Sequence, residues 1–275
     1  MLTTYQTRDT GVANETLSGG FGDVRFEIRH GMRTAIKTSR NTNTTMLYEA
    51  DILSRLHHPF IPVVISSTKY EIVLVDFGRR CLIDTLTKDE MRRDECDKVA
   101  WCVGSALAYM HGMKFHHSDV KCDNVVVDSF GDAILIDYNL SKHSTTAVAS
   151  TRCGSLTYMP PEMHKKFSTW NPFAADVWSF SVLYFAILFR CEPFDSKFSI
   201  FARFEMLQPH HGSIHSLRII YNNSERLTRP DVHNIHERAL DSMMQPNPEL
   251  RLDMTSVEYT LYCIKHGLGT THTTC

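Results

Sequence analysis

The residues best suited to chemistry lie in one polar stretch, His117 to Asn124, which reads HSDVKCDN. It places a carboxylate at Asp119, an amine at Lys121 and an amide oxygen at Asn124, and a second carboxylate, Asp137, follows further along the chain. The apolar runs between them, interrupted by a turn, predict a β-hairpin that ends at Asp137. A carboxylate to orient a hydroxyl, a lysine beside the moving group and two oxygen ligands for Mg²⁺ suit the transfer of a γ-phosphoryl group.

This stretch resembles the catalytic loop of eukaryotic-type protein kinases, H-R-D-x-K-x-x-N, except that Ser118 replaces the arginine. The D-F-G metal-binding motif of that family is matched by Asp137-Tyr138-Asn139. Asparagine tolerates a positive φ better than other non-glycine residues, so we expect Asn139 to keep the turn. The resemblance implies ATP and Mg²⁺ as cofactors, with Asp119 and Lys121 as catalytic residues and Asn124 and Asp137 as metal ligands.

A glycine-rich stretch lies near the start of the chain. Gly19, Gly20 and Gly22 leave the backbone free to approach a ligand, although an ordinary turn explains the same pattern. Compared with the family's G-x-G-x-x-G-x-V, Gly19, Gly22 and Val24 match, Leu17 holds the first glycine position, and the neighbouring Gly20 compensates. The resemblance implies that these residues bind ATP.

A lysine follows behind the glycines, in Thr34-Ala35-Ile36-Lys37, which resembles V-A-I-K. In the family this alanine packs on adenine and this lysine reaches the α- and β-phosphates. A lysine in a cleft needs a counter-charge, and Glu49 lies on a predicted helix that Pro59 ends. The alternative is that both side chains are simply solvated. The short interval between Lys37 and Glu49 predicts a trimmed connection.

The surrounding pattern predicts an α+β protein. Apolar alternation, with a turn at His30-Gly31, predicts an antiparallel sheet of about five strands, and Asp97 to His111 predicts a helix that supports Asp119. The resemblance implies a bilobal kinase-like fold, with a small antiparallel β-sheet N-lobe that carries one helix and a larger, mainly helical C-lobe. The predicted ranges are a kinase domain over 12–265, with an N-lobe over about 12–75, a hinge over about 76–80 and a C-lobe over about 81–265, followed by a short polar tail over 266–275.

The stretch after Asp137 resembles the activation segment of the family. It runs from Leu140-Ser141-Lys142 through a Ser/Thr-rich loop to Thr151 and then from Cys153 to Glu162, with Pro160-Pro161-Glu162 in the place of A-P-E. Ser155 stands where serine/threonine kinases carry a hydroxyl residue, which favours serine and threonine substrates. The resemblance also implies that Arg251, in a P-x-x-R pattern, pairs with Glu162, and that Asp176 begins the central buried helix.

The replacement at Ser118 has a consequence for regulation. In many relatives, the missing arginine binds a phosphate on the activation segment, and Thr151 lies where that phosphate is often carried. Ser118 cannot supply a cation. We therefore expect activity that does not depend on phosphorylation of Thr151.

Composition excludes several classes of protein. The 275 residues are 43% hydrophobic and 22% charged, with a net charge of -2 and a pI near 6.7, so no basic field indicates nucleic acid or an anionic membrane. The apolar run Val177 to Phe189 is short for a bilayer and predicts a buried helix. The N-terminus lacks a signal sequence, and eight cysteines without a C-x-x-C pair indicate a cytoplasmic or nuclear protein. We expect protein substrates and a monomer.

Two alternatives to an active protein kinase remain open. A pseudokinase would keep the fold as a nucleotide-binding or protein-binding scaffold, and Leu17, Asn139 and the short interval before Glu49 are the features that favour it. A phosphotransferase acting on a small molecule would use Asp119 and Asp137 equally well. The retention of the polar catalytic residues and of a protein-substrate platform favours the protein kinase.

Overall fold

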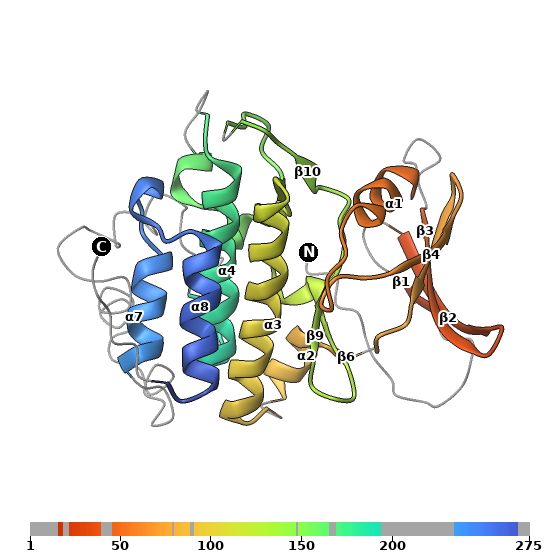
Figure 1. Cartoon of the computed structure of the whole chain (residues 1–275), viewed down its shortest axis with the longest axis horizontal. Coiled ribbons are helices and arrows are strands. Elements are labelled where there is room, and N and C mark those ends of the chain that lie inside the picture. The colour runs from red at the N-terminus through yellow and green to blue at the C-terminus, as the bar shows by residue number, and fades with distance from the viewer. Residues whose placement is uncertain are drawn as a thin grey trace.

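The computed structural model describes residues 16–18, 22–39, 46–78, 80–88, 91–146, 148–164, 169–193 and 234–268. They form two lobes: a twisted sheet with one helix, and a larger, mainly helical part (Figure 1). The fold class predicted from the sequence, a bilobal α+β protein, is confirmed. The predicted domain start at residue 12 and the end of the polar tail lie outside the described residues.

The N-lobe sheet has five strands in the order β1-β2-β3-β5-β4, and every neighbouring pair is antiparallel. The predicted turn between β2 and β3 has φ of 51° at His30 and 77° at Gly31. A turn of this kind matches the twist of the strands it joins, so β2 and β3 pair along their full lengths. The strands are β1 Thr16–Ser18, β2 Gly22–Arg29, β3 Met32–Ser39, β4 Val64–Ser67 and β5 Glu71–Val75.

The N-lobe helix, α1, is Met46–Ser54 and packs against β4 and β5. The sequence predicted that this helix would continue through Leu56 to Pro59, and that prediction is wrong at the C-terminal end. The backbone N–H of Leu56 bonds the carbonyl of Leu53, three residues back, which is the tightened turn that closes a helix. Leu56 is still buried, but as part of the loop that follows.

A second sheet has three strands in the order β6-β8-β9. After β5 the chain passes through Asp76–Gly78 and enters this sheet. The predicted hairpin is formed by β8 and β9, and Asp128 closes its turn because its Oδ1 accepts the N–H groups of Phe130 and Asp132. The hairpin fixes the polar residues that flank it. The strands are β6 Arg80–Cys81, β8 Val125–Val127 and β9 Ala133–Leu135.

Helices dominate the C-lobe, where α3 packs on both α8 and α4 (Figure 1). The helix predicted over Asp97 to His111 is α3, and it begins four residues earlier, at Arg93. It leads into β7 and then into the catalytic-loop stretch. The C-lobe elements are α2 Leu82–Thr87, α3 Arg93–Gly112, β7 Phe115–His116, η1 Cys122–Asn124, β10 Lys142–His143, η2 Leu156–Tyr158, η3 Pro161–His164, α4 Pro172–Phe189, α7 Asn234–Met243, η5 Pro248–Leu250 and α8 Met254–Lys265.

The central helix, α4, is longer than the predicted apolar run and starts at Pro172. Pro172 suits the first helical turn, and the side chain of Asn171 caps that turn by accepting two backbone N–H groups. By length and composition α4 could cross a membrane, but 83% of it is buried inside the protein. Its apolar surface is therefore covered by the C-lobe core.

Candidate active site

A cavity of about 120 Å³ lies between the lobes. Its walls come from β2, β3, α1, the segment after β5, and the β8-β9 hairpin. Ala35 and Leu74 face each other across β3 and β5, which places an apolar pair in the N-lobe wall. The lining is mostly apolar, with the predicted charged residues gathered on one side, and it includes Val24, Ala35, Lys37, Glu49, Leu74, Asn124, Val126, Ile134, Ile136 and Asp137. The structure thus brings six of the predicted site residues together in the lining of one cavity.

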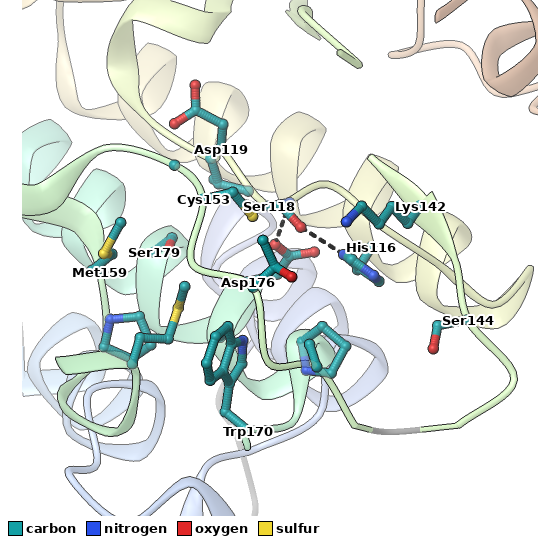
Figure 2. Close-up of a pocket in the computed structure, with 18 of the residues that line it drawn as sticks. His116, Ser118, Asp119, Lys142, Ser144, Cys153, Met159, Trp170, Asp176 and Ser179 are labelled. Atoms are coloured by element: carbon teal, nitrogen blue, oxygen red, sulfur yellow. Dashed lines mark hydrogen bonds between the residues drawn. The ribbon is translucent and has the colours of Figure 1, made fainter. Parts of the chain in front are cut away.

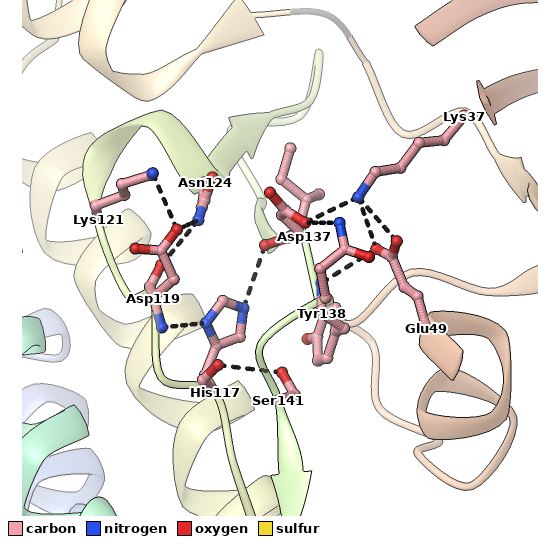
Figure 3. A network of polar contacts seen from close by, with 11 residues as sticks. Lys37, Glu49, His117, Asp119, Lys121, Asn124, Asp137, Tyr138 and Ser141 are labelled. Atoms are coloured by element: carbon pink, nitrogen blue, oxygen red, sulfur yellow. Dashed lines mark hydrogen bonds and ion pairs between the residues drawn. The ribbon is translucent and has the colours of Figure 1, made fainter. Parts of the chain in front are cut away.

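Lys37 joins the two lobes at this cavity (Figure 3). Its Nζ donates to Glu49 Oε1 and Oε2, at 3.0 and 2.8 Å, and to Asp137 Oδ1 at 2.8 Å. Burial alone would lower the pKa of Lys37, but the carboxylates of Glu49 and Asp137 outweigh it and hold that pKa above its ordinary value. Burial likewise acts to raise the pKa of Asp137, and the ammonium of Lys37 brings it below its ordinary value. Lys37 and Asp137 are therefore both charged at neutral pH.

The catalytic-loop residues form a second cluster (Figure 3). Lys121 Nζ lies 2.9 Å from Asp119 Oδ2, and Asn124 Nδ2 donates to the same oxygen at 3.0 Å. The hydroxyl of Ser155 donates to Asp119 Oδ1 at 3.0 Å and accepts from Lys121 Nζ at 3.0 Å. Gly154, with φ of 91°, permits this approach, because a Cβ there would lie 2.5 Å from the Ser118 carbonyl oxygen.

Asp176 was expected to begin the central helix, but α4 starts four residues earlier, at Pro172, so Asp176 lies inside the helix. Its carboxylate holds the backbone of the catalytic loop. Its Oδ2 accepts the N–H of His117 at 2.7 Å, and its Oδ1 accepts the N–H of Ser118 at 2.8 Å. Ser118 has φ of 68°, a region that side chains rarely adopt, so these two bonds stabilise a strained turn just before Asp119. Burial acts to raise the pKa of Asp176, but the hydrogen bond from His111 and the charges of the surrounding histidines outweigh it, so that this pKa lies below its ordinary value.

The turn at Asp137 corrects the expectation for Asn139. The positive φ, 68°, belongs to Asp137, and Asn139 is not among the described residues with positive φ. The side chain of Asn139 instead donates from Nδ2 to Asp137 Oδ1 at 2.8 Å. Asp137 Oδ1 thus accepts from Lys37 and from Asn139, which leaves Oδ2 and the Asn124 amide oxygen facing no described donor.

A second cavity, of about 250 Å³, lies under the activation segment beside Asp119 (Figure 2). Its polar side carries His116, whose Nδ1 lies 2.6 Å from Ser118 Oγ, and Lys142, which pairs with His116 across β7 and β10. Thr151 also lines this cavity. Lys142, to which no sequence motif points, is a cation near Thr151 but is exposed to solvent.

The predicted pair between Glu162 and Arg251 is present. The guanidinium of Arg251 donates from Nη1 to Glu162 Oε1 at 2.6 Å and from Nη2 to Oε2 at 2.7 Å, and both residues are buried. Arg251 also donates to the backbone carbonyls of Gln245 and Ala174. This bidentate pair fastens the end of the activation segment to the C-lobe.

The glycine-rich stretch is described only in part. Gly19 and Gly20 lie outside the described residues, and Leu17 is placed by its backbone, opposite Val24. A Cβ at Gly22 would lie 2.0 Å from the carbonyl oxygen of Thr38, so packing between β2 and β3 already requires glycine there. The packing of the two strands therefore explains the glycine at position 22 without any ligand.

The comparisons with known proteins agree with this geometry. The family model for the protein kinase domain matches residues 16–263, so the chain belongs to the protein kinase family. CBL-interacting serine/threonine-protein kinase 21 of Arabidopsis thaliana is 26% identical over 241 residues, which cover 86% of this chain and 51% of that protein. Aurora kinase of Dictyostelium discoideum is 26% identical over 226 residues, covering 76% and 58%. Protein kinase kin1 of Schizosaccharomyces pombe is 29% identical over 170 residues, covering 59% and 19%. The chain thus spans less than two thirds of the length of these relatives.

Proposed function

We propose that this protein kinase domain is active and transfers the γ-phosphoryl group of Mg-ATP to serine and threonine hydroxyls of proteins. The observation that carries the proposal is the ion-paired cluster of Lys37, Glu49 and Asp137, which closes across the lobes beside Asp119. A scaffold has no need to keep these charges aligned. Their burial and mutual pairing favour an active enzyme over the pseudokinase alternative.

Each residue of the site has a role that follows from its position. Lys37, held by Glu49, binds the α- and β-phosphates of ATP, while Val24 and Ala35 contribute apolar walls for the base. Asp119 accepts a hydrogen bond from the substrate hydroxyl and fixes its direction of attack. Lys121 offsets the charge on the moving phosphoryl group. Alignment and electrostatic stabilisation supply the rate.

The donor set fits Mg²⁺. Among the described residues there is no cluster of three His, Cys, Asp or Glu side chains suited to a metal, so the protein would contribute few ligands. Asn124 and Asp137 offer the two hard oxygens described above, which is the usual protein share when phosphates and water complete the shell. They would hold Mg²⁺, which neutralises charge on the phosphate oxygens.

The substrate class is inferred from Ser155 and from the relatives. Ser155 bridges Asp119 and Lys121, a position that favours an aliphatic hydroxyl in the substrate. The Arabidopsis relative is named as a serine/threonine-protein kinase, which supports the same substrate class. We place the protein in the cytoplasm or nucleus, without a nucleic-acid or membrane partner. The seven described cysteines are all free, which supports a reducing compartment.

The test is phosphate transfer by the purified chain to a panel of generic protein substrates in Mg²⁺ and ATP. Asp119→Asn should lower turnover by about 10²-fold or more. Asp94→Asn, which alters an exposed carboxylate on α3, is the matched control and should retain wild-type turnover. ATP binding without turnover in the wild type would instead support the scaffold, and phosphorylation of small molecules only would support the third alternative. Equal turnover by wild type and Asp119→Asn would contradict the proposed mechanism.

A further inference from the structure

Tyr48, next to Glu49 on α1, makes a contact that the mechanism above does not use. Its hydroxyl donates to the backbone carbonyl oxygen of Ser141 at 2.7 Å. Ser141 lies four residues after Asp137, at the start of the activation segment. Tyr48 is 45% exposed, so burial does not by itself explain why the side chain lies there.

Ser141, which bonds Tyr48, is also bonded to the catalytic loop. It is fully buried, its N–H donates to the Tyr138 carbonyl at 3.1 Å, and its hydroxyl donates to the His117 carbonyl at 3.2 Å (Figure 3). His117 in turn lies next to the strained turn before Asp119. Three segments are therefore linked through Ser141: α1, the chain after Asp137, and the catalytic loop.

We propose that Tyr48 is a positioning residue that holds α1 in the position in which Glu49 contacts Lys37, and that it does so without a phosphate on the activation segment. Successive residues of a helix point about 100° apart around its axis. Glu49 reaches Lys37 and the N–H of Tyr138, whereas Tyr48 reaches Ser141. Two anchors in different directions fix the rotation of this nine-residue helix, which neither contact could do alone.

The contact is independent of phosphorylation because of its chemistry. A phenol hydroxyl donates to a backbone carbonyl, and neither group needs to be modified. Partial burial, and then the carboxylate of Asp51, raise the pKa of Tyr48, so it stays a donor at neutral pH. Ser118, at the position of the missing arginine, is engaged with His116. The inference rests on the proposed function only in its effect on turnover.

The test compares Tyr48→Phe, which removes only the hydroxyl, with Tyr70→Phe, which removes the hydroxyl of an exposed N-lobe tyrosine. In Tyr48→Phe we expect the α1 amides to exchange with deuterium about fivefold faster. Turnover should fall about fivefold, equivalent to about 1 kcal/mol at 1.36 kcal/mol per tenfold change. Binding of adenosine, which lacks the phosphates that Lys37 contacts, should stay within about twofold of wild type. Tyr70→Phe should match wild type in every measurement.

A further variant, Ser141→Ala, keeps the carbonyl that Tyr48 bonds and should leave exchange in α1 unchanged. If it speeds that exchange as much as Tyr48→Phe does, general loosening is the cause and the proposal is overturned. The same conclusion follows if Tyr48→Phe and Tyr70→Phe are indistinguishable. Amide exchange needs no turnover, so an inactive wild type would refute the proposed function while this test still decides the role of Tyr48.

Discussion

At the scale of single residues, the site depends on two residues whose backbone conformations most residues avoid. Asp137 and Ser118 both have φ of 68°, and each is stabilised by several bonds to its surroundings. Asp137 is held through its carboxylate by Lys37 and Asn139, and Ser118 through its backbone by Asp176. Strain of this kind, of order 1–3 kcal/mol for each residue, persists only where neighbouring contacts enforce it.

Thr151→Ala should retain at least a tenth of wild-type turnover, a change smaller than about 1.4 kcal/mol. A phosphate on Thr151 would find no arginine at Ser118. The exposed Lys142 nearby would contribute little, since exposed ion pairs are worth about 0–1 kcal/mol. The measurement is turnover of purified Thr151→Ala, with its phosphorylation state checked by mass spectrometry. A loss of more than about 90% would show that a Thr151 phosphate is required.

The sequence predicted which charged residues approach one another, but not which hydrogen bonds the other side chains form. The approach of Lys37 to Glu49 was predictable because a buried charge needs a counter-charge. The bond from Tyr48 to the Ser141 carbonyl was not, because any hydroxyl can bond any backbone carbonyl and only the packing of α1 selects one. For Asn139, the substitution for glycine indicated positive φ, whereas the strain lies at Asp137.

At the scale of elements, the strands were the most predictable part, since alternation and the His30-Gly31 turn specify β2 and β3. The end of α1 was less so, because its closing bond depends on how the following loop packs. The end of the activation segment is fixed in another way. Glu162, in η3, and Arg251, just after η5, are far apart in the chain, and their pair joins two short elements that could not hold their places alone.

Glu162→Gln should lower the free energy of unfolding by about 3 to 5 kcal/mol, because it leaves a buried guanidinium without its counter-charge. Arg55→Lys is the control, because it alters an exposed pair with Asp51 at 4.0 Å and should cost less than about 0.5 kcal/mol. Urea denaturation followed by circular dichroism measures both. The double variant Glu162→Leu/Arg251→Met should cost less than the sum of Glu162→Leu and Arg251→Met measured singly, since it removes both charges. Additive costs would mean that the two residues are not coupled.

At the scale of the whole molecule, several histidines are buried among the elements that support the catalytic loop. Burial lowers the pKa of His116 and His117, against the opposing charge of Asp176, which faces both. Burial also lowers the pKa of His58, in the loop after α1, against Glu258 of α8. These histidines lie where different segments of the chain pack together, so their protonation changes the free energy of unfolding of the whole fold.

The free energy of unfolding should therefore fall as pH drops from about 6.5, the ordinary histidine pKa. A lowered folded-state pKa means that the unfolded chain binds more protons in this range, so the stability present above pH 6.5 is lost as pH falls through the folded-state values. The slope can reach about 1.4 kcal/mol per pH unit for each histidine. The pKa values of Asp137 and Asp176 are lowered, so their protonation affects the free energy of unfolding only below about pH 4. The effect of the histidines is therefore separate from that of the carboxylates.

Urea denaturation between pH 7.5 and pH 5 measures this dependence. His116→Gln keeps a polar side chain beside Ser118 and cannot titrate, so its stability should fall less steeply with decreasing pH than that of the wild type. His266→Gln, which changes an exposed histidine at the end of α8, should keep the wild-type slope. A wild-type stability that is constant across this range, or an unchanged slope in His116→Gln, would show that His116 is not held neutral by the fold.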